Sequence, residues 1–568
     1  MRTWLIIVCA AGLWSAASGQ TATHADDVKR LIEAYRPFNG PRTAVRRPEG
    51  KCGLQQSVRL LNLWPSLTPA ERRELKSVFF SQQAQADTVI GRFHFYYDTT
   101  GSNAPMLLDD NYNPIPGTYR RFVDSAGAIF NHVWHVEIDQ LGYDPPPLGP
   151  DSTYPIDILS LDQGLYGETV PDPIQIPGSG SPPRYRTFIE IDNTFQYVYS
   201  SSRGLPGLHV TAAHEFHHAI QFGAYGFWGS ANQFYMEITS TWMETVVYPS
   251  VHDYYQYVSD PDPSLLTQFT HPETRFTALN GSIEYSRAVW GKFIEKRFSR
   301  SVMRRSWELM RQQSTLAAVD AALTERGSSF REAFLEYAFW NLNTGPRSDT
   351  GRYYSDGLNY APVAVNSALY FPPSASAASQ TEAFGSVYYS FCLLASPSDS
   401  SGCGAGAAQM PVIVTNLNTG NAYLDIMLPF TYGLSRDPVD GADHLANNLY
   451  AKLYVPDPGN WNARTAVPVV VTEPLVFPNP YRISSTSPVW FRLPVTPVQP
   501  TAHLRIFSSS YHQVYDGDLP VVNFQPLEPS LRWNGIVNSG ALLSSGIYIY
   551  SLTVDNTTYT GKFAAIRQ

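Results

Sequence analysis

The chain has 568 residues, a length that corresponds to roughly three to four domains. Hydrophobic residues make up 43% of it and aromatic residues 13%, so more than one apolar core can form. Charged residues make up only 16%, and the formal net charge is −9, which excludes a basic nucleic-acid-binding surface and a polybasic membrane-binding segment. The 44 prolines and 39 glycines show no period, which excludes collagen and indicates many strands and turns.

The first 19 residues have the pattern of a secretory signal peptide. Arg2 gives a basic start, an apolar run extends from Trp4 to Trp14, and small residues follow up to Gly19. This run is too short for a membrane span, and no later run approaches 18 apolar residues. We therefore expect a secreted or surface-attached protein with no transmembrane segment.

The rest of the chain divides into four regions of different composition. We expect an α+β multidomain fold, because helical patterns precede many short alternating strands. The regions are a helical N-terminal region or propeptide, a mixed region, a β-sandwich and a compact β module, at 20–85, 86–345, 346–472 and 473–568.

Apolar periodicity places the elements within these regions. A helical stripe covers 26–35, and Thr68 with Glu71 forms a capping box before a second helix. Strands are predicted at 93–97, 186–193, 387–394, 411–414, 424–428, 449–455 and 467–471. Further helices are predicted at 118–141, from 210 onward, and at 286–298, 302–313, 315–326 and 330–341.

The most informative motif is His-Glu-x-x-His, formed by His214, Glu215 and His218. No glycine or proline interrupts the surrounding run, so the two histidines lie one helical turn apart on one face and can share one ion. Glu215 is rotated about 100° from His214, which keeps it off the metal face but lets it reach a water molecule there. Two imidazoles holding Zn²⁺ beside a carboxylate base are suited to metal-assisted hydrolysis.

The class of such a site depends on the third ligand. Gln221 and Ala224 stand where a metzincin needs Gly and His, so that class is excluded. Glu237 follows His218 at the gluzincin spacing, HExxH-x18-E, and we expect it to be the third ligand. Glu244 lies on the same helical stripe, and we expect it to orient a ligand histidine; Glu244 as the ligand itself remains the alternative.

The two motif helices resemble the secreted bacterial MXAN-type zinc metalloproteases. The resemblance rests on "TAAHEFHHAIQF" and "EITSTWMETVVYP" and extends more loosely over about 50–345. It implies a zincin-like catalytic domain, with His214, His218 and Glu237 as zinc ligands and Glu215 as the catalytic base. His217 replaces a residue that is often aromatic in the family; we expect it to hydrogen-bond locally rather than to bind zinc.

In gluzincins, a Tyr or His beyond the glutamate helix stabilises the oxyanion, and the resemblance makes Tyr285 our choice for that role. His252, Tyr254 and Tyr255 are the competing choices. The strand at 187–193 resembles the edge strand on which zincins bind an extended substrate backbone. The same strand could also simply belong to the core.

Three cysteines remain after the signal peptide. Cys392 and Cys403 flank a Ser/Gly/Pro-rich loop and could form a disulfide. Cys52, in Lys51-Cys52-Gly53, could cap the zinc in a proform, because a thiolate is a good zinc ligand and this core resembles the cysteine switch of matrix metalloproteases. The alternatives are a buried free thiol or a disulfide to one of the other two cysteines.

The last region resembles bacterial C-terminal sorting and attachment modules. "VFPNPY" from Val476 and "WNG" from Trp533 are shared with type IX secretion sorting domains and flagellar-hook-type immunoglobulin modules. This resemblance implies contact with a cell surface or with the secretion machinery. A carbohydrate- or protein-binding module is the alternative.

The sequence therefore predicts a secreted zinc-dependent endopeptidase that acts on protein or peptide substrates. The alternative from another class is a non-catalytic surface adhesin in which a zincin-like domain is only a scaffold. An intact base next to the metal favours the peptidase, because a scaffold does not need one.

Overall fold

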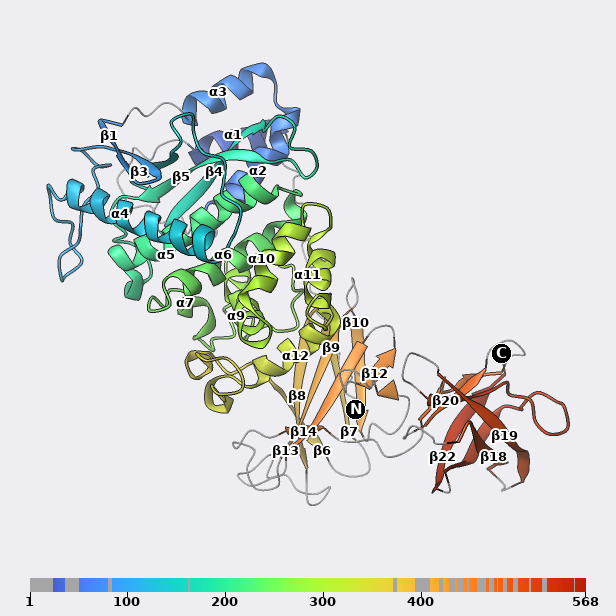
Figure 1. Ribbon diagram of the computed structural model, residues 1–568. Coiled ribbons are helices and arrows are strands. Elements are labelled where there is room, and N and C mark those ends of the chain that lie inside the picture. The colour runs from blue at the N-terminus through green and yellow to red at the C-terminus, as the bar shows by residue number, and fades with distance from the viewer. Residues whose placement is uncertain are drawn as a thin grey trace, which may run out of the picture.

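The structure is a computed structural model in which residues 24–35, 51–79, 84–161, 164–370 and, in shorter pieces, much of 375–567 are described. It is a mixed α/β multidomain protein with helices and several sheets (Figure 1). The predicted signal peptide and the predicted disulfide between Cys392 and Cys403 fall outside the described residues and side chains. None of the described helices combines the length and the hydropathy needed to cross a membrane.

The N-terminal half is built on a mixed five-stranded sheet with the order β1-β2-β3-β5-β4. Its strands are β1 (Ala86–Ile90), β2 (Phe93–Tyr97), β3 (Tyr154–Leu159), β4 (Gly167–Gln175) and β5 (Tyr185–Asp192). The three central strands are parallel, and β1 and β4 pair antiparallel at the two edges. Burial alternates along β2 and β3, as expected for strands that pack one face on a core.

Helices form most of the remaining N-terminal half (Figure 1). They are α1 (His24–Tyr35), α2 (Leu54–Leu63), α3 (Pro69–Phe79), α4 (Tyr119–Trp134), α5 (Leu205–Ile220), α6 (Gln233–Val247), α7 (Tyr255–Val258), α8 (Ile283–Ser286), α9 (Ala288–Arg297), α10 (Arg300–Leu309), α11 (Thr315–Thr324) and α12 (Phe330–Leu342). Short π-helical turns, His135–Gln140 and Gln221–Tyr225, extend α4 and α5. The predicted helices are present, with shifted ends.

Two of the helices near the site begin at residues other than those predicted. The helix predicted from 210 begins at Leu205, because Pro206 fits the first turn of a helix, where no backbone N–H partner is needed. The helix predicted at 286–298 is α9, which begins at Ala288, and the short helix α8 precedes it and ends at Ser286. The predicted capping box is confirmed, since Thr68 N donates to Glu71 Oε2 at 2.7 Å and Glu71 N donates to Thr68 Oγ1 at 3.3 Å.

The expectation that the strand at 187–193 is an edge strand is wrong. This strand is β5, and it lies between β3 and β4. The edge beside α5 is β4, whose Pro171 and Pro173 interrupted the strand pattern in the sequence. Proline lacks a backbone N–H and is therefore found on edge strands. The two prolines that made β4 hard to predict are thus consistent with its position at the edge.

One continuous hydrophobic core spans the predicted boundary at residue 85. It includes Cys52, Leu54 and Val58 as well as the side chains that α5 and α6 bury, and it extends to Ile413. Helix α2 packs directly against β4. The segment that begins at residue 51 therefore belongs to the same body as the His-Glu-x-x-His motif.

Among the described residues from Asn366 onward, strands form three sheets with seven, two and eight members. The first two sheets contain β6 (Asn366–Tyr370), β7 (Ala375–Thr381), β8 (Ser386–Leu393), β9 (Gln409–Asn416), β10 (Ala422–Leu428), β11 (Ser435–Arg436), β12 (Asp443–Ala446), β13 (Leu449–Pro456) and β14 (Ala466–Pro468). The eight-stranded sheet contains β15 (Leu475–Phe477), β16 (Tyr481–Arg482), β17 (Val489–Arg492), β18 (Thr501–Ser508), β19 (Gln513–Asn523), β20 (Pro529–Trp533), β21 (Gly546–Val554) and β22 (Thr557–Ile566), and has its own core.

We predict that Gly291→Ala destabilises the helical body. A Cβ at Gly291 in α9 would lie 2.3 Å from Cγ of Trp242 in α6, and Trp242 is fully buried. Overpacking of this kind costs about 1–3 kcal/mol and should lower the midpoint of thermal unfolding followed by tryptophan fluorescence. Gly351→Ala is the control, because its Cβ would meet nothing closer than 3.4 Å; equal midpoints for the two variants would contradict the prediction.

Candidate metal centre

The motif lies on two neighbouring helices that have almost no exposed surface. Every residue of α5 from Val210 to Ile220 is buried, and so is every residue of α6. The two helices pack against each other. Because a buried polar group without a partner is costly, the histidines and glutamates that these helices carry must find partners inside the protein.

The proton on His218 can be placed from its neighbours. The Nε2 amide of Gln221 donates to the backbone carbonyl of Met236 at 3.2 Å, and this carbonyl can only accept. Gln221 Oε1 therefore faces His218 Nδ1, 2.7 Å away, and accepts its proton. With the proton on Nδ1, the lone pair of His218 is on Nε2.

His214 is held in the same way by an acidic residue of α6. Its Nδ1 lies 2.7 Å from Glu244 Oε1, and Glu244 is paired with the buried ammonium of Lys51 at 2.7 Å. A carboxylate in this position accepts the Nδ1 proton and leaves the lone pair of His214 on Nε2. Glu244 therefore contacts His214 on the side away from the motif partner His218.

Three electron-rich atoms then converge on one point. The two Nε2 atoms of His214 and His218 are 3.1 Å apart, and Glu237 Oε2 lies 3.1 Å from the first and 3.5 Å from the second. Lone pairs at these distances repel unless a cation lies among them. Two imidazoles and a carboxylate are the donor set of a catalytic zinc site, so these residues fit a zinc ion.

The pKa values of the same residues indicate a site that attracts positive charge. Burial lowers the pKa of His214, but hydrogen bonds to Glu237 and Glu244 outweigh it and raise the pKa to about 9. Burial raises the pKa of Glu237, but hydrogen bonds to His214 and His218 outweigh it and lower the pKa to about 2. In the absence of a metal, a proton fulfils the electrostatic role of the cation.

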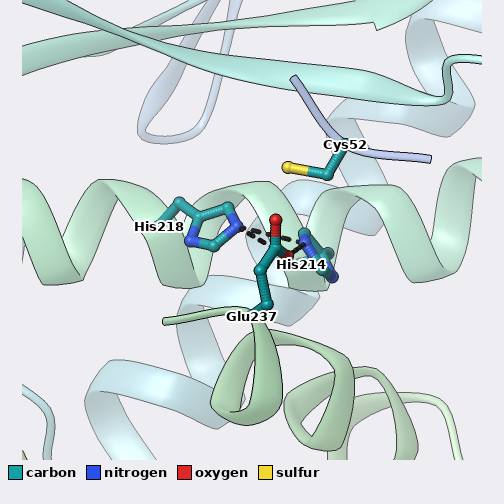
Figure 2. A group of neighbouring side chains, drawn as sticks. All are labelled: Cys52, His214, His218 and Glu237. Carbon is teal, nitrogen blue, oxygen red and sulfur yellow. Dashed lines mark hydrogen bonds and ion pairs between the residues drawn. The ribbon is translucent and has the colours of Figure 1, made fainter. Parts of the chain in front are cut away.

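Cys52 is the fourth member of a cluster of possible metal ligands, which consists of Cys52, His214, His218 and Glu237 and is called the metal group below. One donor atom from each of Cys52, His214, His218 and Glu237 lies within 4.8 Å of the others. Figure 2 shows the Cys52 sulfur approaching the histidines from the side of the sheet, whereas Glu237 reaches them from α6. Ligand atoms of a tetrahedral zinc ion lie about 3.3–3.8 Å apart, so the widest separations in this group must shorten by about 1 Å for all four donors to bind one ion. Cys52 itself is a free, buried thiol, which agrees with one of the alternatives considered from the sequence.

Glu215 lies beside this group and is also buried. Thr169 Oγ1 of β4 lies 2.8 Å from Glu215 Oε2 and 2.8 Å from its backbone oxygen. Burial and then the charges of Glu215 and Glu237 raise the pKa of the Cys52 thiol well above its ordinary value. Glu215 lies close to Gly167, the bridge partner of Cys52, so the carboxylate and the thiol are neighbours.

Of the residues considered for oxyanion stabilisation, the described structure brings only Tyr285 to the metal group. Its hydroxyl donates to Glu237 Oε1 at 3.5 Å, and burial followed by the charge of Glu237 raises its pKa, so it is a neutral donor. Tyr254 instead donates to Asp356 at 2.9 Å. His252 stacks on Tyr255, with ring centroids 4.7 Å apart.

His217 points away from the metal group. Its Nδ1 lies 2.7 Å from Glu137 Oε2 in the π-helical turn after α4, and its ring meets Tyr143 edge-on. Both partners of the His217–Glu137 pair are fully buried. The hydrogen bond to Glu137 is the local use that we expected for this imidazole.

Several residues around the site were not found from the sequence. Gln221 could have been, because it follows His218 by three positions and so shares its helix face. Thr169 and Lys51 could not, because they reach the site only through the pairing of distant segments. Asp253, which also pairs with Lys51 at 2.8 Å, lies beyond the end of α6, and no sequence pattern connects it with the motif.

Comparisons with known proteins give little further information. No protein-family model and no curated protein matches the chain. The structure of PorZ, an essential bacterial surface component of the type-IX secretion system of Porphyromonas gingivalis, is 17% identical over 28% of this chain and 21% of PorZ, with a TM-score of 0.13. The structure of dimeric latent PorU from Porphyromonas gingivalis is 14% identical over 29% of this chain and 13% of PorU, with a TM-score of 0.14. Overlaps this small establish neither a shared fold nor a shared function.

We predict that Glu244→Gln weakens zinc binding about 10–100-fold, the usual effect of removing an acceptor that orients a ligand histidine. The variant keeps the shape of the side chain but loses the charge that faces His214 Nδ1. Zinc affinity is measured by competition with a chromophoric chelator. Glu308→Gln is the matched control, because Glu308 pairs only with arginines near the surface, and affinities that do not differ between the two variants would contradict the prediction.

Proposed function

We propose that this protein is a secreted zinc-dependent endopeptidase with a zincin-like catalytic domain. The observation that carries the proposal is the convergence of His214 Nε2, His218 Nε2 and Glu237 Oε2 beside the buried carboxylate of Glu215. A zinc ion bound to these three atoms would supply Lewis acidity, which polarises a carbonyl group and acidifies water.

The roles of the chain's own residues follow from their positions. Glu215 accepts a proton from the attacking water and passes it to the nitrogen of the leaving amine. Thr169 holds the carboxylate of Glu215 by its hydrogen bond. Tyr285, a neutral donor next to Glu237, stabilises the negative charge that develops on the carbonyl oxygen.

The substrate backbone is expected to bind along β4. This strand is the edge of the sheet beside α5, and an edge strand binds an extended peptide by strand addition. In the structure Gly167 O and Thr169 O of this edge accept from Gly53 N and Ser57 Oγ, so substrate would replace these partners. Gly167 allows the close approach of β4 to α5, because a Cβ there would lie 2.7 Å from Thr211 Cγ2 and 3.1 Å from Glu215 Cγ. An extended protein or peptide is therefore the substrate class that suits this edge.

A second candidate function is a non-catalytic surface adhesin with a structural metal site. The observation in its favour is the position of Cys52, because four protein ligands around zinc are typical of a structural site and a catalytic site keeps one position for water. Under either function, export through residues 1–19 and attachment through 473–568 remain proposals from the sequence.

We predict that Glu215→Gln keeps zinc and loses at least about 100-fold in the rate of casein hydrolysis, because the amide cannot accept a proton. Since Cys52 and Glu215 are neighbours, the exchange is made both in the natural chain and in a chain with Cys52→Ser. Zinc content by elemental analysis and the cleavage rate are measured on the same samples.

The control is Glu273→Gln, a carboxylate outside the metal group. Zinc bound in every sample with no difference in hydrolysis between Glu215→Gln and its parent would exclude the peptidase and favour the adhesin.

A further inference from the structure

Lys51, Cys52 and Gly53 lie along the edge of the sheet over the metal group. Cys52 forms a parallel bridge with Gly167, the first residue of β4. Gly53 N donates to Gly167 O at 3.1 Å, and Tyr166 N donates to Lys51 O at 2.9 Å. These three residues therefore occupy the part of the edge on which an extended substrate would pair.

The backbone pairing directs the Cys52 side chain into the metal group. Its sulfur lies within 4.8 Å of donor atoms of His214, His218 and Glu237, and Glu215 lies close to Gly167, the bridge partner of Cys52. A water molecule that attacks a substrate needs the same place, between the metal and Glu215. The thiol and the reactive water therefore exclude each other.

Lys51 anchors the segment next to Cys52. Its ammonium pairs with Glu244 at 2.7 Å and Asp253 at 2.8 Å, and all three side chains are at most 5% exposed. The ring centroids of Tyr166 and Tyr285 lie 5.6 Å and 6.0 Å from the same nitrogen. Two buried carboxylates would lose their cationic partner if the segment moved away, and breaking such a buried ion pair is costly.

We propose that Lys51–Gly53 is a built-in inhibitor of the metal centre, in which the Cys52 thiolate is the fourth ligand and Lys51 holds it in place. The proposal rests on the proposed function, whose regulation it describes. The thiol loses its proton to solvent as the S–metal bond forms, and two neutral imidazoles, one carboxylate and one thiolate balance a divalent cation. Activation exchanges the S–metal bond for water, and the thiolate takes up a proton again.

The proposal is tested first without any activity assay, by replacing the metal with Co²⁺. Thiolate ligation gives an intense sulfur-to-cobalt charge-transfer band in the near ultraviolet, which imidazole and carboxylate ligands do not give. We expect this band in the natural chain and in Gln55→Ala, a control in α2 close to Cys52, and its loss in Cys52→Ser with cobalt still bound. Cobalt bound to the natural chain without the band would overturn the proposal and leave the proposed function intact.

The second measurement is hydrolysis of casein by the zinc-loaded proteins. We expect Cys52→Ser to be at least tenfold faster than the natural chain. Gln55→Ala should match the natural chain. Equal rates for Cys52→Ser and the natural chain would overturn the inhibitor. Hydrolysis that is absent from all variants, with the charge-transfer band present, would overturn the proposed function and identify Cys52 as a ligand of a structural site.

Discussion

The convergence of two histidine nitrogens and one carboxylate oxygen is the interaction on which the surrounding arrangement depends. It arises because α6 and the part of α5 that carries the motif are buried, so their polar side chains must find partners inside the protein. Both imidazoles carry their Nδ1 protons outward, to Gln221 and Glu244, and turn Nε2 inward. Such an arrangement is stable only around a positive charge.

The partners of the imidazoles also hold the two helices together. Gln221 Nε2 donates to the Met236 carbonyl and to Thr239 Oγ1 at 3.0 Å, so one amide ties α5 to α6 and sets the tautomer of His218. Glu244 extends the same network to Lys51, 193 positions away in the sequence. The segment before α2 is thereby linked, through Glu244, to the orientation of the His214 ring.

The sheet contributes an edge rather than ligands. β4 passes close to α5 because Gly167 has no side chain, and this closeness brings Thr169 to Glu215 and the bridge with Cys52 over the histidines. A single edge therefore serves two roles in the proposed mechanism, as the binding site for substrate backbone and as the docking site for Lys51–Gly53.

The sequence by itself determined the part of the site that depends on helical periodicity. His214, Glu215 and His218 follow from spacing within one helix, and Glu237 follows from its distance along the chain and from the resemblance of its helix. The tertiary structure decided which strand is the edge, that Cys52 and Lys51 reach the centre, and that Tyr285 rather than Tyr254 stands beside Glu237. The physical reason is that helix faces repeat every few residues, whereas strand order and buried ion pairs join distant segments that no local pattern connects.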